Sequence, residues 1–374
     1  LRDDTQFTVA CLKLASLGAL NYRRKQQLLA HYSHPACIFD APLAELAELL
    51  KVKQHFLHDH IHSIDTDRIR QQAALLRELR IDILLHSAPD YPPNLKQIND
   101  APPLLFIQGN TELLSGPQLA MVGSRHASPS GLKTAAAFAA ELAASGLTIC
   151  SGLASGVDTA AHKGAVEQIG STVAVVATGL DEVYPRANAA LARSIGGRGC
   201  MVSEFPPRTP ARRAHFPQRN RIISGLSLGV LVVEADTRSG SLITARLAGE
   251  QGREVFAIPG SIHSPTSRGC HQLIRQGAKL VETTADVLVE IKPALQQTLD
   301  SKPHARPAPP PTPGAGGSEE EKVLNLVDFA PTPLEDIVAH SNLPIERVSS
   351  ALLQLELAGR VSPLPGGQYQ RVPD

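Results

Sequence analysis

Tryptophan is absent from the chain of 374 residues, and aromatic residues make up only 4% of it. This scarcity excludes a broad platform of aromatic rings for stacking nucleobases. Cysteine is also rare, and no two of the five cysteines form a C-x-x-C pair: they are Cys11, Cys37, Cys150, Cys200 and Cys270. Their spacing excludes a disulfide scaffold and a cysteine-based zinc site, and it favours reduced thiols in a cytoplasm.

Long apolar runs are missing as well. No stretch approaches the roughly 18 consecutive apolar residues that a membrane span needs, so we expect no membrane partner. Residues 1–4 contain neither a start methionine nor an apolar signal region. We therefore expect a trimmed N-terminus and a cytoplasmic rather than a secreted protein.

An excess of one charge is also lacking, because 36 basic and 36 acidic side chains cancel to a formal net charge of zero. This balance argues against a histone-like polycation, but it hides uneven segments. Residues 318–374 carry 4 basic and 9 acidic side chains, whereas residues 186–221 carry eight arginines against Glu204 alone. Clustered arginine suits phosphate, because the guanidinium fork matches phosphate oxygens. The alternative is a solvated face with internal ion pairs.

Proline and glycine are concentrated in residues 298–317, where they predict a semi-rigid linker. The linker separates a small C-terminal module, residues 318–374, from the rest of the chain. Residues 1–80 carry apolar side chains at helical spacing and are predicted to form a helical domain. Residues 81–117 are richer in proline and more extended, with a short strand at 104–107.

From residue 118 onward, short apolar runs alternate with Ala- and Leu-rich segments of helical period. Apolar strands that alternate with helices indicate a mostly parallel sheet covered on both faces. We therefore predict a Rossmann-like α/β domain over residues 81–297, with residues 81–117 as its extended first part. The expected strands are 119–122, 147–150, 173–177, 201–202, 229–233, 254–258 and 279–281.

Glycine, serine and charged residues follow most of these strands. Ligands of such sheets bind outside the carboxyl ends of the strands, so we expect these loops to form one site. Gly123-Ser124 and Ser239-Gly240-Ser241 are expected to lead into helices, where free N–H groups and the helix dipole favour a phosphate. Arg125 adds a full positive charge beside the first loop. A helix-capping role for Ser239 or Ser241 is the alternative.

The common nucleotide fingerprints are absent. No G-x-G-x-x-G follows the first strand and no acidic residue ends the second, which disfavours NAD. Neither G-x-x-x-x-G-K-[ST] nor G-x-S-x-G occurs, so the sequence predicts neither a P-loop ATPase nor a serine-hydrolase elbow.

An aromatic residue with neighbouring arginines suggests a nucleic acid. Phe216 precedes Arg219, Asn220 and Arg221, and Arg213 lies just upstream. Stacking of a base on an aromatic ring, with arginines on the backbone, binds single strands without sequence preference. The alternative for Phe216 is a place in the hydrophobic core.

Two histidine patterns have simpler explanations. Asp158 and His162 are four residues apart on one helical face, where a helix-start aspartate with a hydrogen-bonded histidine is favoured over an acid–base pair. His58 and His62 have the spacing of metal ligands, but no cysteine or carboxylate cluster accompanies them. We expect a solvated surface there and no metal site.

Taken together, the motifs resemble those of the DprA/Smf family (DNA-processing protein A, also called Smf). The flanks agree, since residues 1–80 resemble a SAM-like domain and residues 318–374 a winged-helix module. In that module, 319–327, 332–340 and 345–358 would be helices and 361–372 the wing. The motifs follow in family order at 121–125, 151–162, 175–185, 216–226, 234–245, 256–260, 267–269 and 273–278.

The resemblance implies a protein without enzymatic activity, cofactor or metal that binds single-stranded DNA. It also implies a homodimer formed through the Rossmann-like domain, and the loading of RecA recombinase during natural transformation or homologous recombination. The positions of this sequence that match the family's motifs would supply the phosphate contacts and a stacking ring. With the second glycine–serine loop, the predicted DNA-binding set is Gly123, Ser124, Arg125, Arg186, Arg213, Phe216, Arg219, Asn220, Arg221, Ser239, Gly240 and Ser241.

Two other interpretations stay open. Nucleotide phosphoribohydrolases share this Rossmann variant, but the loop that carries their catalytic glutamate is residues 237–244 here and does not match it. A scaffold with a vestigial phosphate site is the other. For the acidic module 318–374 we expect a protein partner rather than duplex DNA, because duplex binding needs cations that face phosphates.

Overall fold

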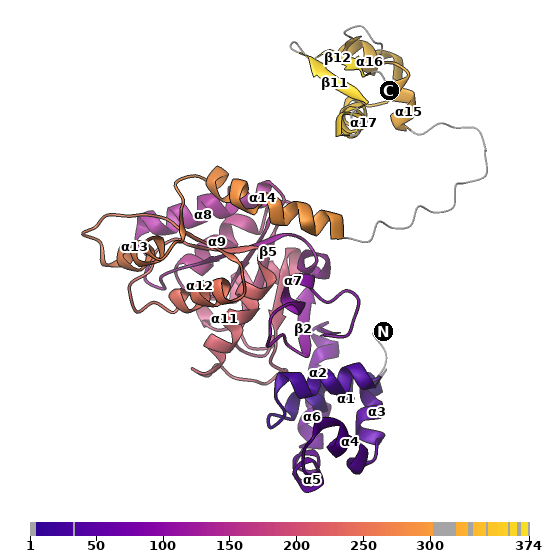
Figure 1. Cartoon of the computed structure of the whole chain (residues 1–374), viewed down its shortest axis with the longest axis vertical. Helices are drawn as coiled ribbons and strands as arrows, with labels where there is room; N and C mark the ends of the chain where they lie inside the picture. The colour runs from indigo at the N-terminus through magenta and orange to yellow at the C-terminus, as the bar shows by residue number, and fades with distance from the viewer. Residues whose placement is uncertain are drawn as a thin grey trace, which may run out of the picture. The chain divides into compact units, whose positions relative to one another are not determined.

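A computed structural model describes residues 5–32, 34–301, 319–327, 332–341, 343–357, 360–364 and 368–372 (Figure 1). The chain divides into two compact units, residues 1–302 and residues 303–374. The predicted linker 298–317 lies almost entirely outside the described residues. Helix α14 (Thr284–Ser301) extends into its first residues, with Pro293 inside the helix.

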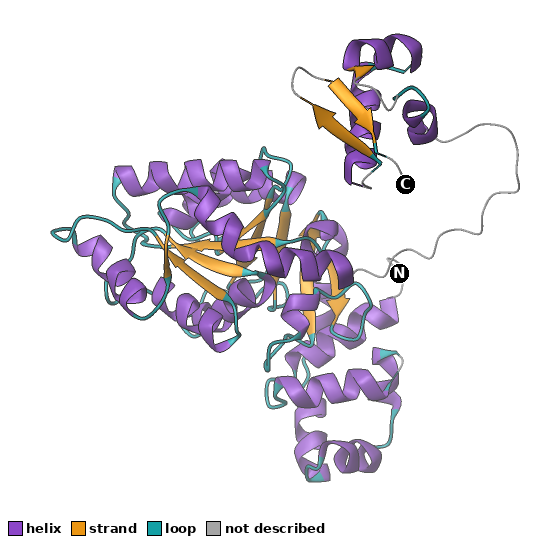
Figure 2. Ribbon diagram, turned by 45° about the horizontal axis from the view of Figure 1, so that its top comes forward, coloured by secondary structure: helices purple, strands orange, loops and turns teal. Residues whose placement is uncertain are grey.

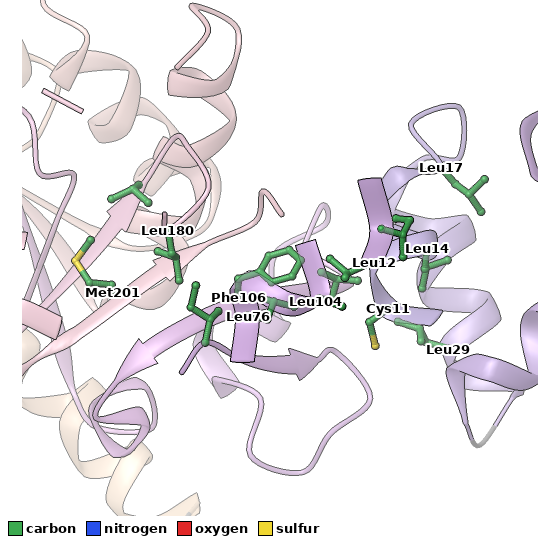
Figure 3. Packing of buried hydrophobic residues seen from close by; sticks show 14 of the residues in the cluster. Cys11, Leu12, Leu14, Leu17, Leu29, Leu76, Leu104, Phe106, Leu180 and Met201 are labelled. Carbon is green, nitrogen blue, oxygen red and sulfur yellow. The ribbon is translucent and has the colours of Figure 1, made fainter. Parts of the chain in front are cut away.

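The first unit begins with six helices that pack around leucine side chains at helical spacing. Leu12 and Leu14 are fully buried in α1, as the apolar pattern predicts. The same hydrophobic cluster continues through Leu76 to Phe106 and Met201 of the sheet (Figure 3). The helical part therefore shares its core with the α/β part. These helices are α1 (Thr5–Ser16), α2 (Tyr22–His31), α3 (Pro35–Asp40), α4 (Leu43–Leu50), α5 (Gln54–His62) and α6 (Thr66–Glu78).

A nine-stranded sheet follows, in the order β1-β2-β6-β5-β4-β3-β7-β8-β9. The strands from β6 to β9 in that order run parallel, while β2 is antiparallel to both β1 and β6. The prediction of a mostly parallel sheet is confirmed. The strands are β1 (Asp82–Leu85), β2 (Leu104–Gly109), β3 (Gln118–Val122), β4 (Thr148–Ser151), β5 (Thr172–Val176), β6 (Cys200–Ser203), β7 (Gly229–Val232), β8 (Glu254–Ala257) and β9 (Lys279–Leu280).

Helices cover both faces of this sheet (Figure 2). Alternate residues of β3 enter different cores: Leu119 and Met121 pack with α8, α9 and α14, whereas Ala120 and Val122 pack with α11, α12 and α13. This two-sided burial is the reason for the continuous apolar runs. The covering helices are α7 (Pro93–Lys96), α8 (Pro129–Ala144), α9 (Val157–Ala165), α10 (Ala189–Arg198), α11 (His215–Leu226), α12 (Ser241–Glu250) and α13 (Arg268–Arg275); 3₁₀ turns are η1 (Thr111–Leu114), η2 (Arg186–Asn188) and η3 (Pro265–Ser267).

The strand order reverses beside β3. From β3 the chain adds β4, β5 and β6 on one side, and then returns to place β7 against the other side of β3. Loops that leave neighbouring strands in opposite directions open a crevice at the carboxyl edge, and ligands of such sheets bind there.

The second unit has its own small core, which includes Val323, Ile337 and Leu352. Its three strands pair in the order β10-β12-β11. The predicted helices and wing are present among the described residues, except that residues 332–333 form a strand. The elements are α15 (Glu319–Leu324), β10 (Thr332–Pro333), α16 (Leu334–Ser341), α17 (Ile345–Leu357), β11 (Val361–Leu364) and β12 (Gln368–Arg371).

Within the described ranges of both units, the helices are all too short or too polar to cross a bilayer.

Candidate functional site

A cavity of about 520 Å³ lies at the reversal of strand order, between the loops that follow β3 and β7. Nine of the twelve predicted residues line it: Gly123, Ser124, Arg125, Phe216, Arg219, Asn220, Ser239, Gly240 and Ser241. The structure adds residues that the sequence analysis did not select, among them Asp158, Arg238 and Thr244. We call this cavity the switch-point pocket.

The loop after β3 forms the first wall. The Ser124 amide donates to the Glu234 carbonyl oxygen at 2.6 Å, and the Val157 amide donates to the Ser124 carbonyl oxygen at 3.1 Å. A side chain at Gly123 would collide with Val157 and with the Glu234 carbonyl, so close packing requires glycine there. Two other chain segments, the one after β7 and the start of α9, therefore hold this loop in place.

The N-terminus of α8 is already occupied by a carboxylate. Glu234 accepts hydrogen bonds from the Ser128 amide at 2.8 Å and from the Ser128 hydroxyl at 2.6 Å. The positive end of the α8 dipole is therefore satisfied within the protein. A ligand anion in the switch-point pocket has to use other groups.

The N-terminus of α12 is different. Gly240 precedes the helix and provides no side-chain cap. Ser239 and Ser241 join their hydroxyls at 2.6 Å, and the Ser239 hydroxyl accepts the Ser241 amide at 3.3 Å. Ser239 therefore caps one amide at the start of α12, as the alternative interpretation predicted. Since all three residues also line the pocket, the positive end of the α12 dipole faces the cavity.

Arg219 forms the deep part of the opposite wall, on α11. Its side chain is only 4% exposed, and its Nη1 donates to the Val175 carbonyl at 3.1 Å. Its Nε has no hydrogen-bond partner in the described structure. A Cβ at Gly152 would lie 1.4 Å from Nη1, so glycine makes room for the guanidinium. Burial lowers the pKa of Arg219, an effect that the Asp158 carboxylate opposes. Arg219 therefore lines the cavity, while its unpaired Nε is itself buried.

Asp158 balances this charge at the start of α9. Its carboxylate accepts the amides of Gly152 and Ala154 at 3.1 and 3.3 Å. Burial raises its pKa, while Arg219 and the two backbone donors lower it. The carboxylate thus holds the loop after β4 through two hydrogen bonds, and its negative charge interacts with the positive charge of Arg219.

Arg125 and Phe216 meet at the mouth of the pocket. The exposed guanidinium of Arg125 lies 5.4 Å from the centre of the half-buried Phe216 ring. Phe216 belongs to none of the buried hydrophobic clusters of the described structure, which argues against the core interpretation. A cation over an aromatic ring stabilises both groups in place.

Arg221 differs from the expectation that it lines the groove. It is 4% exposed, pairs with Asp100 at 3.0 Å and with Glu204 at 2.7 Å, and stacks on Tyr22 at 4.5 Å. Two residues along a helix turn a side chain by roughly 200°, so Arg219 and Arg221 leave α11 on opposite sides. Arg221 joins the N-terminal helices to the sheet and does not line the pocket, so its prediction as a groove residue is not supported.

The other two predicted arginines, Arg186 and Arg213, are exposed and do not line the pocket. Elsewhere in the arginine-rich segment 186–221, Arg198 pairs with Glu167, and Arg208 donates to Gln71. The alternative of internal ion pairs therefore holds for part of this segment.

The histidine expectations can be compared directly with the structure. His58 and His62 stack with ring centres 4.0 Å apart in α5. No group of three or more potential metal ligands occurs within the residues described. His162 is fully buried: its Nε2 accepts the Leu153 amide at 3.3 Å, and its Nδ1 contacts the Thr172 hydroxyl at 2.7 Å. The structural explanation of His162 is confirmed.

This burial predicts a dependence of stability on pH. Burial lowers the pKa of His162 from 6.5 to about 3, so protons bind the unfolded chain more readily. The contribution of neutral His162 to the free energy of unfolding is therefore complete above pH 6.5. It falls as the pH drops from 6.5 toward 3, and about 2 kcal/mol is lost at pH 5. Between pH 7 and pH 5, the free energy of unfolding should fall less in His162→Gln than in the wild type.

Urea denaturation at a series of pH values measures this difference. His126→Gln, which removes an exposed histidine, is the matched control and should keep the wild-type slope. Equal slopes in the wild type and His162→Gln would contradict the assignment.

Comparison with known proteins follows the same division of the chain. The family model of DNA recombination-mediator protein A matches residues 82–292, and the DprA winged helix domain matches residues 305–367. Protein Smf of Escherichia coli is 39% identical over 366 residues, covering 97% of this chain and 95% of its own length. DNA processing protein DprA of Streptococcus pneumoniae is 52% identical over 202 residues, covering 54% of this chain and 71% of its own.

Solved structures agree with the fold. The crystal structure of DNA processing protein A from Streptococcus pneumoniae superposes with a TM-score of 0.67 at 40% identity, covering 76% of this chain and 97% of that one. The protein from Helicobacter pylori, whose structure is described as showing a single-stranded DNA binding mode, superposes with a TM-score of 0.53 at 28% identity. It covers 58% of this chain and 97% of that one.

Proposed function

The chain belongs to the DNA recombination-mediator protein A family, and we propose that it binds single-stranded DNA in the switch-point pocket. The observation that carries the proposal is the convergence of three guanidinium groups, those of Arg125, Arg219 and Arg238, on this one cavity. A phosphate group supplies both the opposite charge and the acceptors that guanidinium groups need.

The surrounding groups fit the same ligand. The positive end of the α12 dipole favours an anion, and the exposed Arg125 adds a full charge at the mouth. Phe216 offers a ring face beside these phosphate donors. Only an unpaired base can lie flat on such a ring, so this combination favours a single strand over a duplex. The Helicobacter pylori relative, described as binding single-stranded DNA, supports the proposal.

Titration of a labelled oligonucleotide of a few dozen bases, as a single strand and as a duplex over a salt series, tests the proposal. We expect preference for the single strand, with an affinity that falls steeply as salt increases. Equal affinity for both forms, or no binding, would contradict it. Release of a free base from a nucleoside monophosphate would instead support the phosphoribohydrolase interpretation.

The α12 terminus can be tested with one pair of variants. Gly240 has helical backbone angles, and a Cβ there would meet no atom within 4 Å. Gly240→Asp places a negative charge where we propose a phosphate, so single-strand affinity should fall roughly tenfold through like-charge repulsion. Folding should not suffer, because an aspartate at a helix N-terminus is stabilising.

Gly240→Asn is the neutral control of the same shape, and fluorescence anisotropy measures all three proteins. If the Asp and Asn variants bind DNA equally well, the terminus of α12 does not contact the strand.

We further propose that the protein acts without cofactor or catalysis, as a homodimer that loads RecA recombinase on single-stranded DNA during transformation or recombination. The description of the matching family as a DNA recombination mediator supports the role in recombination. Light scattering tests the dimer, and RecA filament growth on DNA coated with a single-strand binding protein tests loading. For the acidic module we propose a protein partner, which tight duplex binding by an isolated 318–374 fragment would contradict.

A further inference from the structure

One aromatic side chain beside the switch-point pocket belongs to none of the hydrophobic clusters of the described structure. Tyr184 stands in the loop that follows β5, and 49% of it is exposed. Its hydroxyl has no hydrogen-bond partner in the described structure. Other tyrosines have partners: Tyr91 donates to the Pro102 carbonyl, Tyr32 donates to Glu45, and Tyr22 stacks on Arg221. A half-exposed ring whose hydroxyl makes no hydrogen bond within the described residues needs an explanation in a chain so poor in aromatics.

The contact of Tyr184 is with the predicted stacking residue. The Tyr184 and Phe216 ring centres are 5.7 Å apart, and the rings are inclined at 61°. The Arg125 guanidinium lies over the same Phe216 ring at 5.4 Å. Phe216 therefore contacts both Arg125, at the pocket mouth, and Tyr184, on the loop after β5.

The angle between the two rings determines what they can bind. Rings inclined at 61° cannot sandwich one base between parallel faces, so each ring presents a face of its own. Neighbouring nucleotides of a duplex strand are about 3.4 Å apart along the axis and stay stacked on each other. Rings that are 5.7 Å apart and steeply inclined suit two bases that have come apart.

We propose that Tyr184 is a second base-stacking residue, which binds the nucleobase next to the one on Phe216. This inference rests on the proposed single-strand function. Exposed arginines flank the pair in the sequence: Arg186 lies two residues after Tyr184, and Arg213 three residues before Phe216. These two predicted arginines lie outside the pocket, and their role would be to neutralise backbone phosphates of the bound nucleotides.

The lack of tryptophan allows a direct test. Tyr184→Trp creates a protein with one tryptophan, so its fluorescence reports on that position alone. Binding of oligothymidine should quench this fluorescence, because the base stacks on the indole. An abasic strand of equal length and charge should bind without quenching.

Ile169→Trp is the matched control. Ile169 is 87% exposed and lies just before the N-terminal end of β5, whereas the loop with Tyr184 follows the C-terminal end of this strand. Its fluorescence should not respond to either strand. Equal quenching of both variants, or none at Tyr184→Trp while oligothymidine is bound, would overturn the inference.

Affinity measurements complete the test. Tyr184→Ala should weaken oligothymidine binding roughly 5- to 100-fold and leave abasic-strand binding unchanged, whereas Tyr184→Phe should bind like the wild type. Equal losses for both strands, or no loss, would overturn the role of Tyr184 only. If the wild type binds neither strand, the proposed function fails as well.

Discussion

The double variant Arg125→Ala/Arg238→Ala is expected to bind oligothymidine roughly 100-fold more weakly than the wild type. Both side chains are exposed, line the switch-point pocket and have no ion-pair partner in the described structure. A hydrogen bond to a charged group contributes about 1.5–3 kcal/mol, so two lost phosphate contacts account for the effect. The logarithmic salt slope should fall by roughly 1.4, since each phosphate contact on a single strand contributes about 0.7.

A matched pair removes the same charge elsewhere. Arg193 and Arg246 are exposed on α10 and α12 and do not line the pocket. Their double alanine variant should bind within about twofold of the wild type, because salt screens exposed charges that do not contact the strand. Anisotropy titrations at several salt concentrations compare the variants. Equal losses in both would show that net charge, not the pocket, determines affinity.

Arg221→Ala is expected to lower the free energy of unfolding by about 3–5 kcal/mol, the second large effect. The guanidinium is buried between Glu204 and Asp100 and covers the Tyr22 ring. Its removal leaves Glu204, a largely buried carboxylate, without its charge partner, which costs more than the intact pair contributes. Burial raises the pKa of Glu204, and Arg221 lowers it. The carboxyl of Glu204 should therefore titrate at higher pH in the variant.

Urea denaturation measures the loss, with Arg212→Ala as the control because this exposed arginine lies in the same arginine-rich segment. The control should change stability by less than about 0.5 kcal/mol. Arg221→Met/Glu204→Leu should recover much of the stability, since apolar replacement removes both buried charges. A loss below about 1 kcal/mol in Arg221→Ala would contradict the structural role.

The α/β architecture was predictable because its strands are buried on both faces. Residues 119–122 read as an apolar run, and the structure shows them alternating between two cores. The position of the pocket was predictable for a similar reason, since parallel strands bring their following loops to one edge. Gly123 and Ser239–Ser241 could thus be placed in one site although they are far apart in the sequence.

Side-chain partners could not be predicted in the same way. Arg219 and Arg221 read alike in sequence, yet one lines the pocket and the other joins two parts of the fold. Deciding between them requires the rotation of α11 against the sheet, which depends on packing from distant segments. Asp100 and Tyr22, the distant partners of Arg221, gave no local signal. Arg238 did have a signal, because it directly precedes Ser239 in a loop that the sequence predicts to bind phosphate.

Photo-crosslinking tests the central claim most directly, because it locates the strand on the full-length protein. A single strand that carries 5-iodouracil is irradiated in complex with the protein, and the crosslinked peptides are identified by mass spectrometry. We predict crosslinks in the peptides that contain Phe216 and Tyr184, which lie at the mouth of the switch-point pocket and beside it. Crosslinks confined to residues 1–80 or to residues 318–374 would contradict the account.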